Sequence, residues 1–253
     1  MRFYNFIFTV NNNDLIGGTT MSILLKSIKL TIFLALISYT SPVFSSAQAE
    51  EVVWTLHGVA LFSGTDPVSK AIKEVTQSPF SHVGIILRDS SKPVDDTKSL
   101  ACFESTGSIT QILRGEYPQV QLNPWDQDVK GYPGGVTTRT VTFDKEPDLK
   151  VISAFVKKFK GEGYEDNMLV LVKAVFDDNK TDNEHTMFCS ELDAQLFKDL
   201  GLFPQGERAD NYLPKHFSAQ YERPLTGAKY GPEVAVKVYP DGSKAGCGSC
   251  TIL

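Results

Sequence analysis

Two short segments of this chain carry the residue types of a thiol-dependent enzyme. Residues 81–87, SHVGIIL, place His82 at the start of an apolar strand, and residues 188–192, FCSEL, place Cys189 at the start of an amphipathic helix. A thiolate attacks carbonyl carbons, and an imidazole within hydrogen-bond reach activates it. The pair therefore predicts nucleophilic catalysis by Cys189 with His82 as its base.

The position of Cys189 supplies one device for lowering the pKa of its thiol. The first turn of the helix that follows presents unpaired N–H groups and the positive end of the helix dipole. The alternative is a buried, inert cysteine on the inner face of that helix. Because the cysteine opens the helix, we favour the functional interpretation.

Glu104 is the candidate for the third group of a triad. We expect strand 100–105 to pair with strand 81–88 as a hairpin, which puts Glu104 beside His82. A carboxylate there holds the imidazole in one tautomer. Cys102 shares its strand face by alternation and is expected in the same pocket. The alternative for Glu104 is a solvated carboxylate at a strand end.

The other histidines do not predict a metal centre. His185 precedes Cys189 by four residues, but a metal site needs two further ligands, and no cluster in the sequence supplies them. His57 and His216 are isolated, which is typical of structural or surface roles. We therefore predict no metal and no cofactor.

Alternating and helical patterns outline the elements that must position these residues. The predicted strands are 52–56 and 59–62, broken at His57-Gly58, then 81–88, 100–105, 119–122, 136–143 and 234–239. The predicted helices are 68–75, 149–159 ending near Gly161, 168–176, and 190–200 ending at Gly201. The residues after 242 are Gly/Ser/Cys-rich and are expected to be unstructured.

Composition limits the class of protein. With 42% hydrophobic and 22% charged residues, the chain is ordinary for a globular protein, and we expect a single folded domain. A formal net charge of −5 lacks the basic excess that nucleic-acid binding requires, so we exclude that class.

The amino-terminal segment is typical of export. Lys26 and Lys29 precede the apolar run 30–37, and Ala47-Gln48-Ala49 supplies a cleavage pattern. We predict a signal peptide at 21–49, a start at Met21 rather than within 1–20, a hydrolase domain at 50–228, and a last strand with a flexible, Cys-containing tail at 229–253. The alternative, an uncleaved anchor, is disfavoured because the run is shorter than the ~20 residues of a membrane span.

The four cysteines do not indicate a disulfide framework, because Cys189 needs a free thiolate. A strained bond between Cys247 and Cys250 stays open. The last four residues, CTIL, fit a prenylation motif at Cys250, and Cys247 could take a second acyl chain. Two lipids give stable membrane anchoring where one gives marginal binding. The alternative is a chance match.

Export and prenylation conflict, because prenyltransferases are cytosolic and eukaryotic. A bacterial effector that enters a host cell satisfies both, with host membrane association. The alternatives are a periplasmic or secreted enzyme with an accidental tail, and a eukaryotic protein whose signal is not used.

The ordered landmarks SHVGII, FESTG, GYED, FCSEL and YLP resemble the permuted NlpC-type, YiiX-like papain-fold hydrolases from about residue 52 to 217. The His-before-Cys order is the reverse of papain's. The resemblance implies an α+β, circularly permuted papain-like fold, with an antiparallel sheet packed on helices. It also implies Cys189 as nucleophile, His82 as base and Glu104 as orienting acid. Substrate contacts would then come from Ser81, Tyr164 and Ser190.

One departure concerns the first strand. Members of the family usually open with a Gly-Asp-Ile/Leu strand, whereas residues 56–61 here read LHGVAL. Relatives of this fold act on peptidoglycan peptides, other amides or lipid acyl groups. We predict hydrolysis of a peptide or peptidoglycan-type amide. The alternatives are a lipid acyltransferase or lipase with the same triad, and a binding module without catalysis.

Overall fold

The computed structural model describes residues 52–107, 118–165, 173–175, 179, 186–238 and 251–252. The predicted signal peptide at 21–49 and the two tail cysteines, Cys247 and Cys250, lie outside these ranges. His185 and most of the predicted helix at 168–176 also lie outside them, although 173–175 are helical.

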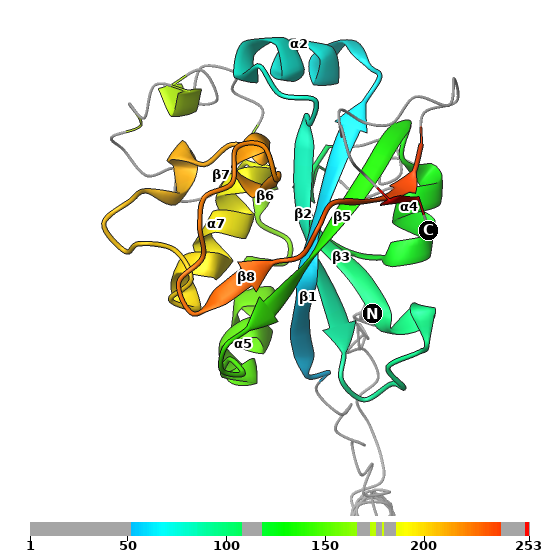
Figure 1. Cartoon of the computed structure of the whole chain (residues 1–253), viewed down its shortest axis with the longest axis vertical. Helices are drawn as coiled ribbons and strands as arrows, with labels where there is room; N and C mark the ends of the chain where they lie inside the picture. Colours follow the sequence, from blue (N-terminus) through cyan, green and yellow to red (C-terminus); the bar gives the residue numbers. More distant parts are fainter. Residues whose placement is uncertain are drawn as a thin grey trace, which may run out of the picture. The chain divides into compact units, whose positions relative to one another are not determined.

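A large, mostly antiparallel sheet dominates the described part of the chain, where ten strands form one sheet and nine of them follow the order β10-β9-β5-β1-β2-β3-β4-β6-β7 (Figure 1). β8 pairs with β5 outside this order, and the β6–β7 and β9–β10 pairs are parallel. The strands are β1 Trp54–Gly64, β2 His82–Asp89, β3 Leu100–Thr106, β4 Gln119–Pro124, β5 Gly134–Phe143, β6 Gly163–Tyr164, β7 Thr186–Met187, β8 Ala228–Tyr230, β9 Val234–Lys237 and β10 Thr251–Ile252.

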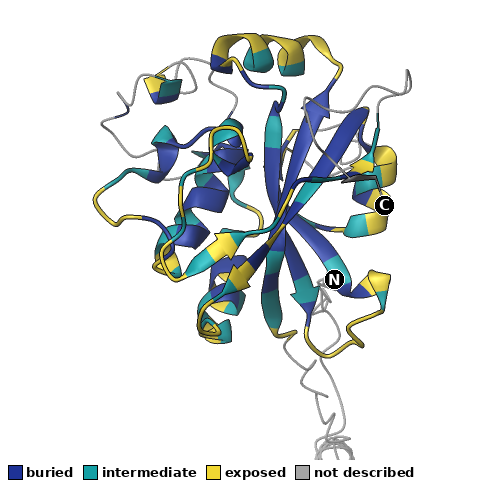
Figure 2. Ribbon diagram, viewed as in Figure 1, coloured by how far each residue is buried: buried dark blue, intermediate teal, exposed yellow. Residues whose placement is uncertain are grey.

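Helices cover both faces of this sheet, with α5 and α7 on one face and α4 on the other (Figure 1). The helices are α2 Pro67–Thr76, α4 Trp125–Gly131, α5 Leu149–Phe159 and α7 Cys189–Asp199, with 3-10 turns η1 Thr97–Ser99, η2 Ala209–Asn211 and η3 Pro214–Phe217. The central strands are buried along most of their length (Figure 2). No helix in the described ranges has the length and apolar character to cross a membrane.

The apolar side chains of alternate strand positions fill these two layers. The larger core lies between the sheet and α5 and α7 and includes Val59, Leu61, Val83, Ile85, Phe103, Ile152, Leu192 and Phe197. The smaller core lies under α4 and includes Ala60, Phe62, Ile86, Cys102 and Val136. Because strand side chains alternate between faces, even-numbered residues of β2 and β3 face α4.

Most predicted elements are confirmed, but the predicted break at His57-Gly58 is wrong. β1 runs through it as one strand, with a shift of register between Leu56 and Gly58 in its pairing with β2. A Cβ on Gly58 would lie 2.1 Å from the carbonyl oxygen of Arg139 on β5. The glycine therefore marks a close approach of two backbones inside a strand rather than the end of one.

The predicted hairpin of β2 and β3 is confirmed, with Ile85 opposite Phe103 and Ile86 opposite Cys102. A Cβ on Gly84 would lie 2.7 Å from Cys102 Sγ. Because Gly84 has no side chain, the side chains of β3 can lie across β2 toward His82.

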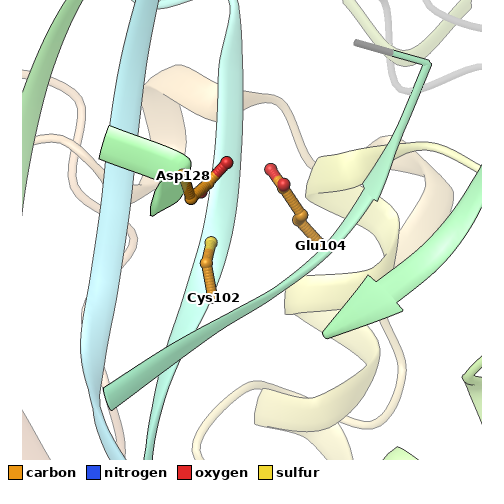
Figure 3. Close-up of side chains that lie close together, drawn as sticks. All are labelled: Cys102, Glu104 and Asp128. Atoms are coloured by element: carbon orange, nitrogen blue, oxygen red, sulfur yellow. The ribbon is translucent and has the colours of Figure 1, made fainter. Parts of the chain in front are cut away.

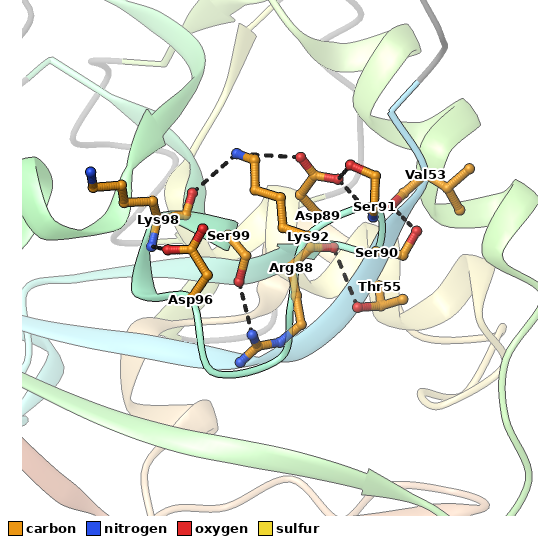
Figure 4. Close-up of polar contacts among 10 residues, drawn as sticks. All are labelled: Val53, Thr55, Arg88, Asp89, Ser90, Ser91, Lys92, Asp96, Lys98 and Ser99. Atoms are coloured by element: carbon orange, nitrogen blue, oxygen red, sulfur yellow. Dashed lines mark hydrogen bonds and ion pairs between the residues drawn. The ribbon is translucent and has the colours of Figure 1, made fainter.

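Polar contacts fasten the connection between β2 and β3 (Figure 4). Arg88 Nη1 donates to Ser99 Oγ at 2.8 Å, and the Ser91 hydroxyl donates to Asp89 Oδ1 at 2.6 Å. These bonds lie at the opposite end of β2 from His82. They stabilise the connection of the hairpin and make no contact with the histidine.

The carboxyl-terminal region contributes two strands at the edge of the sheet. β9 confirms the predicted last strand. Thr251 and Ile252, in the segment expected to be unstructured, pair parallel with Val234 and Ala235 of β9. An edge strand has unpaired backbone groups, and these can bind a further strand.

Candidate active site

His82 and Glu104 form the shortest polar contact of the predicted site. His82 Nε2 lies 2.6 Å from Glu104 Oε2, and Glu104 is only 2% exposed. Both residues have even numbers, so they project from β2 and β3 toward the same face. The hairpin therefore brings together the two residues that the sequence placed side by side.

A second side chain fixes the other oxygen of Glu104. Asn123 Nδ2 donates to Glu104 Oε1 at 2.9 Å, and Asn123 lies on β4 opposite Cys102. Asn123 is not among the site residues predicted from the sequence, although it directly follows the predicted strand 119–122. With one donor on each oxygen, the carboxylate has a single orientation toward His82.

Cys189 is the first residue of α7, after Phe188 as N-cap. His82 lies close enough to the Cys189 thiol to lower its pKa, through its charge and through hydrogen bonding. Because Glu104 occupies Nε2 of the imidazole, Nδ1 is the nitrogen left for the thiol. The structure thus brings Cys189, His82 and Glu104 together in one chain of contacts.

The electrostatics favour a charged Cys189–His82 pair. Burial by itself raises the pKa of the Cys189 thiol, but the His82 charge and hydrogen bond, with the backbone N–H groups of Val83 and Ser190, outweigh it and lower that pKa. Burial by itself lowers the pKa of His82, but Cys189 and Glu104 outweigh it and raise that pKa well above its usual range. A thiolate facing an imidazolium is the expected resting state.

Two acidic residues of α7 lie near this pair without competing with it. Glu191 accepts from the Phe188 N–H at 3.3 Å, and burial raises the pKa of its carboxyl to about 8. Asp193 is completely buried, and within the described residues neither of its carboxyl oxygens has a hydrogen-bond partner. Burial raises its pKa well above the usual range. Glu191 is therefore mostly protonated at neutral pH, and the raised pKa of Asp193 likewise disfavours a negative charge beside the thiolate.

The hydroxyls of Ser81 and Ser190 are occupied within the fold. Ser81 Oγ accepts from the Gly64 N–H at 3.0 Å, and Ser190 Oγ donates to the Tyr212 carbonyl at 2.7 Å. Both serines are buried. These contacts fix the ends of β1 and α7 near the site, and the substrate-binding role of Ser81 and Ser190 stays a prediction.

Tyr164 lies on β6, paired with Met187 of β7 just before α7 begins. It is half-buried, and its ring lies 3.5 Å from where a Cβ on Gly107 would be. Tyr164 therefore lies beside the strand that leads into Cys189. Its role toward a substrate stays a prediction.

His57 and His216 are both affected by burial and by neighbouring charges, and His216 also makes a backbone hydrogen bond. Burial, followed by the charge of Arg88, lowers the pKa of His57 on β1. His216 Nδ1 accepts from the Leu213 N–H at 3.1 Å, and burial lowers its pKa to about 4. Both imidazoles are neutral at pH 7.

Cys102, Glu104 and Asp128 are the candidate group for a metal ion. Their ligand atoms lie within 4.8 Å of one another, and all three residues are buried (Figure 3). However, both oxygens of Glu104 already have partners, and burial raises the pKa of the Cys102 thiol well above its usual range. A protonated thiol is a poor metal ligand, so the group fits a hydrogen-bonded cluster better than a cation site.

Comparisons with known proteins leave the family open. No family model and no curated protein matches the chain. Among solved structures, the chain is similar to the metalloprotein YiiX from Escherichia coli O157:H7, at 17% identity and a TM-score of 0.39. The match covers 74% of this chain and 98% of that one. It agrees weakly with a YiiX-like resemblance, and at these values it assigns neither the permuted papain-like arrangement nor a family.

Proposed function

We propose that this chain is a cysteine hydrolase that cleaves an amide bond through Cys189, His82 and Glu104. The observation that carries the proposal is the continuous contact from Glu104 through His82 to the thiol of Cys189 at a helix start. A nucleophile, a base and a group that orients the base are the three parts of a covalent acyl-transfer site.

In the proposed reaction, the Cys189 thiolate attacks the carbonyl carbon of the substrate and forms a tetrahedral intermediate. The backbone N–H of Cys189, in the first turn of α7, with a neighbouring donor, stabilises the oxyanion. The imidazolium of His82 then gives its proton to the leaving amine, and an acyl-enzyme remains. His82 takes a proton from water, whose oxygen attacks the thioester and releases the acid and the thiol.

Glu104 has an orienting role in this scheme. Because its second oxygen is held by Asn123, the carboxylate cannot rotate away from Nε2 without losing that bond. The imidazole therefore keeps Nδ1 toward sulfur through both proton transfers. The fold proposed with this function is the permuted papain-like arrangement, in which the histidine strand precedes the cysteine helix.

The test is a brief iodoacetamide pulse near pH 6 on the full chain, with peptide mass spectrometry. Cys102 serves as an internal control, because it is also buried and its thiol stays protonated. We expect alkylation of Cys189 and not of Cys102, and loss of that labelling in His82→Ala. Equal labelling of Cys189 in wild type and His82→Ala would mean that no Cys–His pair operates.

Substrate class is decided by a second assay on the same protein. We expect turnover of peptide or peptidoglycan-fragment amides that is lost in Cys189→Ala. Turnover confined to acyl esters of lipids would replace the amidase by a lipid acyl hydrolase with the same triad. A reactive Cys189 with turnover of neither class would favour a binding module.

A further inference from the structure

Asp128 is a buried carboxyl group behind Glu104 that the proposed mechanism does not use. It lies on α4, on the sheet face opposite α7, and is 3% exposed. Figure 3 shows its carboxyl group directed toward that of Glu104, with the side chain of Cys102, from the same strand as Glu104, close to both. The carboxyl oxygens of Asp128 and Glu104 and the Cys102 sulfur that face one another lie within 4.8 Å.

The contacts of the two carboxyl groups are unequal. Glu104 has a donor on each oxygen, His82 on Oε2 and Asn123 on Oε1. Within the described residues, no donor reaches Asp128 Oδ2, although that atom is buried. A buried carboxylate oxygen without a donor is costly, whereas a protonated carboxyl group can itself donate.

Two carboxyl groups in contact do not both ionise in a buried site, so one keeps its proton. Glu104 faces His82 at one oxygen and accepts from Asn123 at the other, whereas Asp128 Oδ2 has no donor within the described residues. Burial, and then the negative charge of Glu104, raise the pKa of Asp128 to about 8. The proton therefore resides on Asp128 at neutral pH.

We propose that Asp128 is a positioning residue: as a neutral carboxylic acid it donates a hydrogen bond to Glu104 and so holds the Glu104 carboxylate, as an anion, against His82. This inference rests on the proposed function of the Cys189–His82–Glu104 site. It extends the chain of contacts to four groups that run from α4, through the sheet, to the first turn of α7.

The other groups around Asp128 are compatible with a neutral acid there. β3 contributes Glu104 and the protonated Cys102, β2 contributes His82, and β9 contributes Lys237. Lys237 Nζ donates to the carbonyls of Val129, Lys130 and Tyr132 at the end of α4, at 2.5 to 3.1 Å. The N–H donors of Lys237 therefore bind the end of α4 and not the Asp128 carboxyl group. The remaining charged side chains of α4 and η1, Asp126, Lys130 and Lys98, are exposed.

The experiment compares Asp128→Asn and Asp128→Ala with wild type in the full chain, using Asp126→Asn and Asp126→Ala as matched controls on the exposed side of α4. The readout is the rate constant of iodoacetamide with Cys189 from pH 5 to 9. An amide donates without a proton to lose, so we expect Asp128→Asn to stay within about threefold of wild type at pH 6. Asp128→Ala removes the donor, and we expect its rate to fall about tenfold, which corresponds to one pKa unit of the thiol.

An infrared difference spectrum supplies a signature that a purely structural role would not give. In the wild-type minus Asp128→Asn difference spectrum at pH 6, where the bands of Glu191 and Asp193 cancel, we expect one protonated-carboxyl C=O band, that of Asp128. The same band should disappear on titration with a midpoint near pH 8. This readout stands even if Asp128→Ala does not fold.

Three results would overturn the inference while leaving the proposed function intact. They are wild-type reactivity in Asp128→Ala, an equal loss in Asp128→Asn and Asp128→Ala, and a stoichiometric metal ion that is lost from Asp128→Asn. Unselective labelling of wild-type Cys189 would instead reject the proposed function, so the two failures are distinguishable.

Discussion

Cys189 and Cys102 are both buried thiols near the same His82–Glu104 pair, yet their surroundings shift their pKa values in opposite directions. Cys189 is 7% exposed and opens a helix, and the pKa of its thiol is lowered by His82 and by backbone N–H groups. Cys102 is completely buried between carboxyl groups, and the pKa of its thiol is raised well above its usual range. Burial alone therefore does not make a cysteine inert or reactive; the charge that faces the sulfur decides it.

The largest expected effect separates the two thiols directly. Cys189→Ala should lower amide turnover by at least about 10³-fold, because the nucleophile is lost. Cys102→Ala should keep turnover within about threefold, because the pKa of this thiol is raised and the thiol takes no part in the proposed reaction. Parallel kinetics of the two variants check this, and a comparable loss in both would end the contrast between them.

Glu104→Gln tests the charge that faces His82. The amide has nearly the same shape but no charge, so the pKa of His82 should fall and less of Cys189 should be thiolate. We expect alkylation of Cys189 at pH 6 to drop about tenfold, or one pKa unit. A pH profile of alkylation shows the shift; an unchanged profile would leave the backbone N–H groups as the main cause of the lowered thiol pKa.

Asn123→Ala tests the second anchor of Glu104. Removing one hydrogen bond to a charged group costs about 1.5–3 kcal/mol. We expect a loss of that size in the free energy of unfolding, measured by urea titration, with a smaller loss of Cys189 reactivity. Reactivity that falls while stability is unchanged would mean that Asn123 orients Glu104 without stabilising the fold.

Gly84→Ala tests the close packing that surrounds Cys102. The new methyl group would lie 2.7 Å from Cys102 Sγ, so the variant should be destabilised by about 1–3 kcal/mol. Adding Cys102→Ala removes that sulfur and should restore part of the loss. A double variant no more stable than Gly84→Ala would show that the conflict is with Glu104 Cβ, at 3.1 Å.

The pH dependence of stability provides the finest test, at Glu191. The pKa of the folded chain's Glu191, about 8, lies above its ordinary value of 4.5, so between these values the unfolded chain releases a proton that the folded chain keeps. The free energy of unfolding should therefore fall as pH rises from about 4.5 to 8, by at most about 1.4 kcal/mol per pH unit. Glu191→Gln should flatten that slope in thermal melts, and an identical slope would mean that Glu191 is ionised in the folded state.

Prediction from the sequence succeeded where the signal is local. The helix from Cys189, the strands on either side of residues 90–99 and the placement of Glu104 beside His82 all follow from periodicity and hairpin pairing. The predicted break at His57-Gly58 is wrong. Gly58 is needed because a side chain there would clash with the carbonyl of Arg139 on β5, about eighty residues away. The sequence around Gly58 does not predict this contact with a distant strand.

The sequence by itself determined which residues could do chemistry: a cysteine that opens a helix, a histidine that opens a strand and a glutamate on the next strand. Only the tertiary structure decided the pKa values of these residues and which side chains surround them. It placed Asn123 and Asp128 around Glu104 and left the buried Asp193 carboxyl group without a hydrogen-bond partner among the described residues. The physical reason is that periodicity records which face of an element is buried. The pKa of a group depends on which charges from distant segments lie within a few ångströms of it.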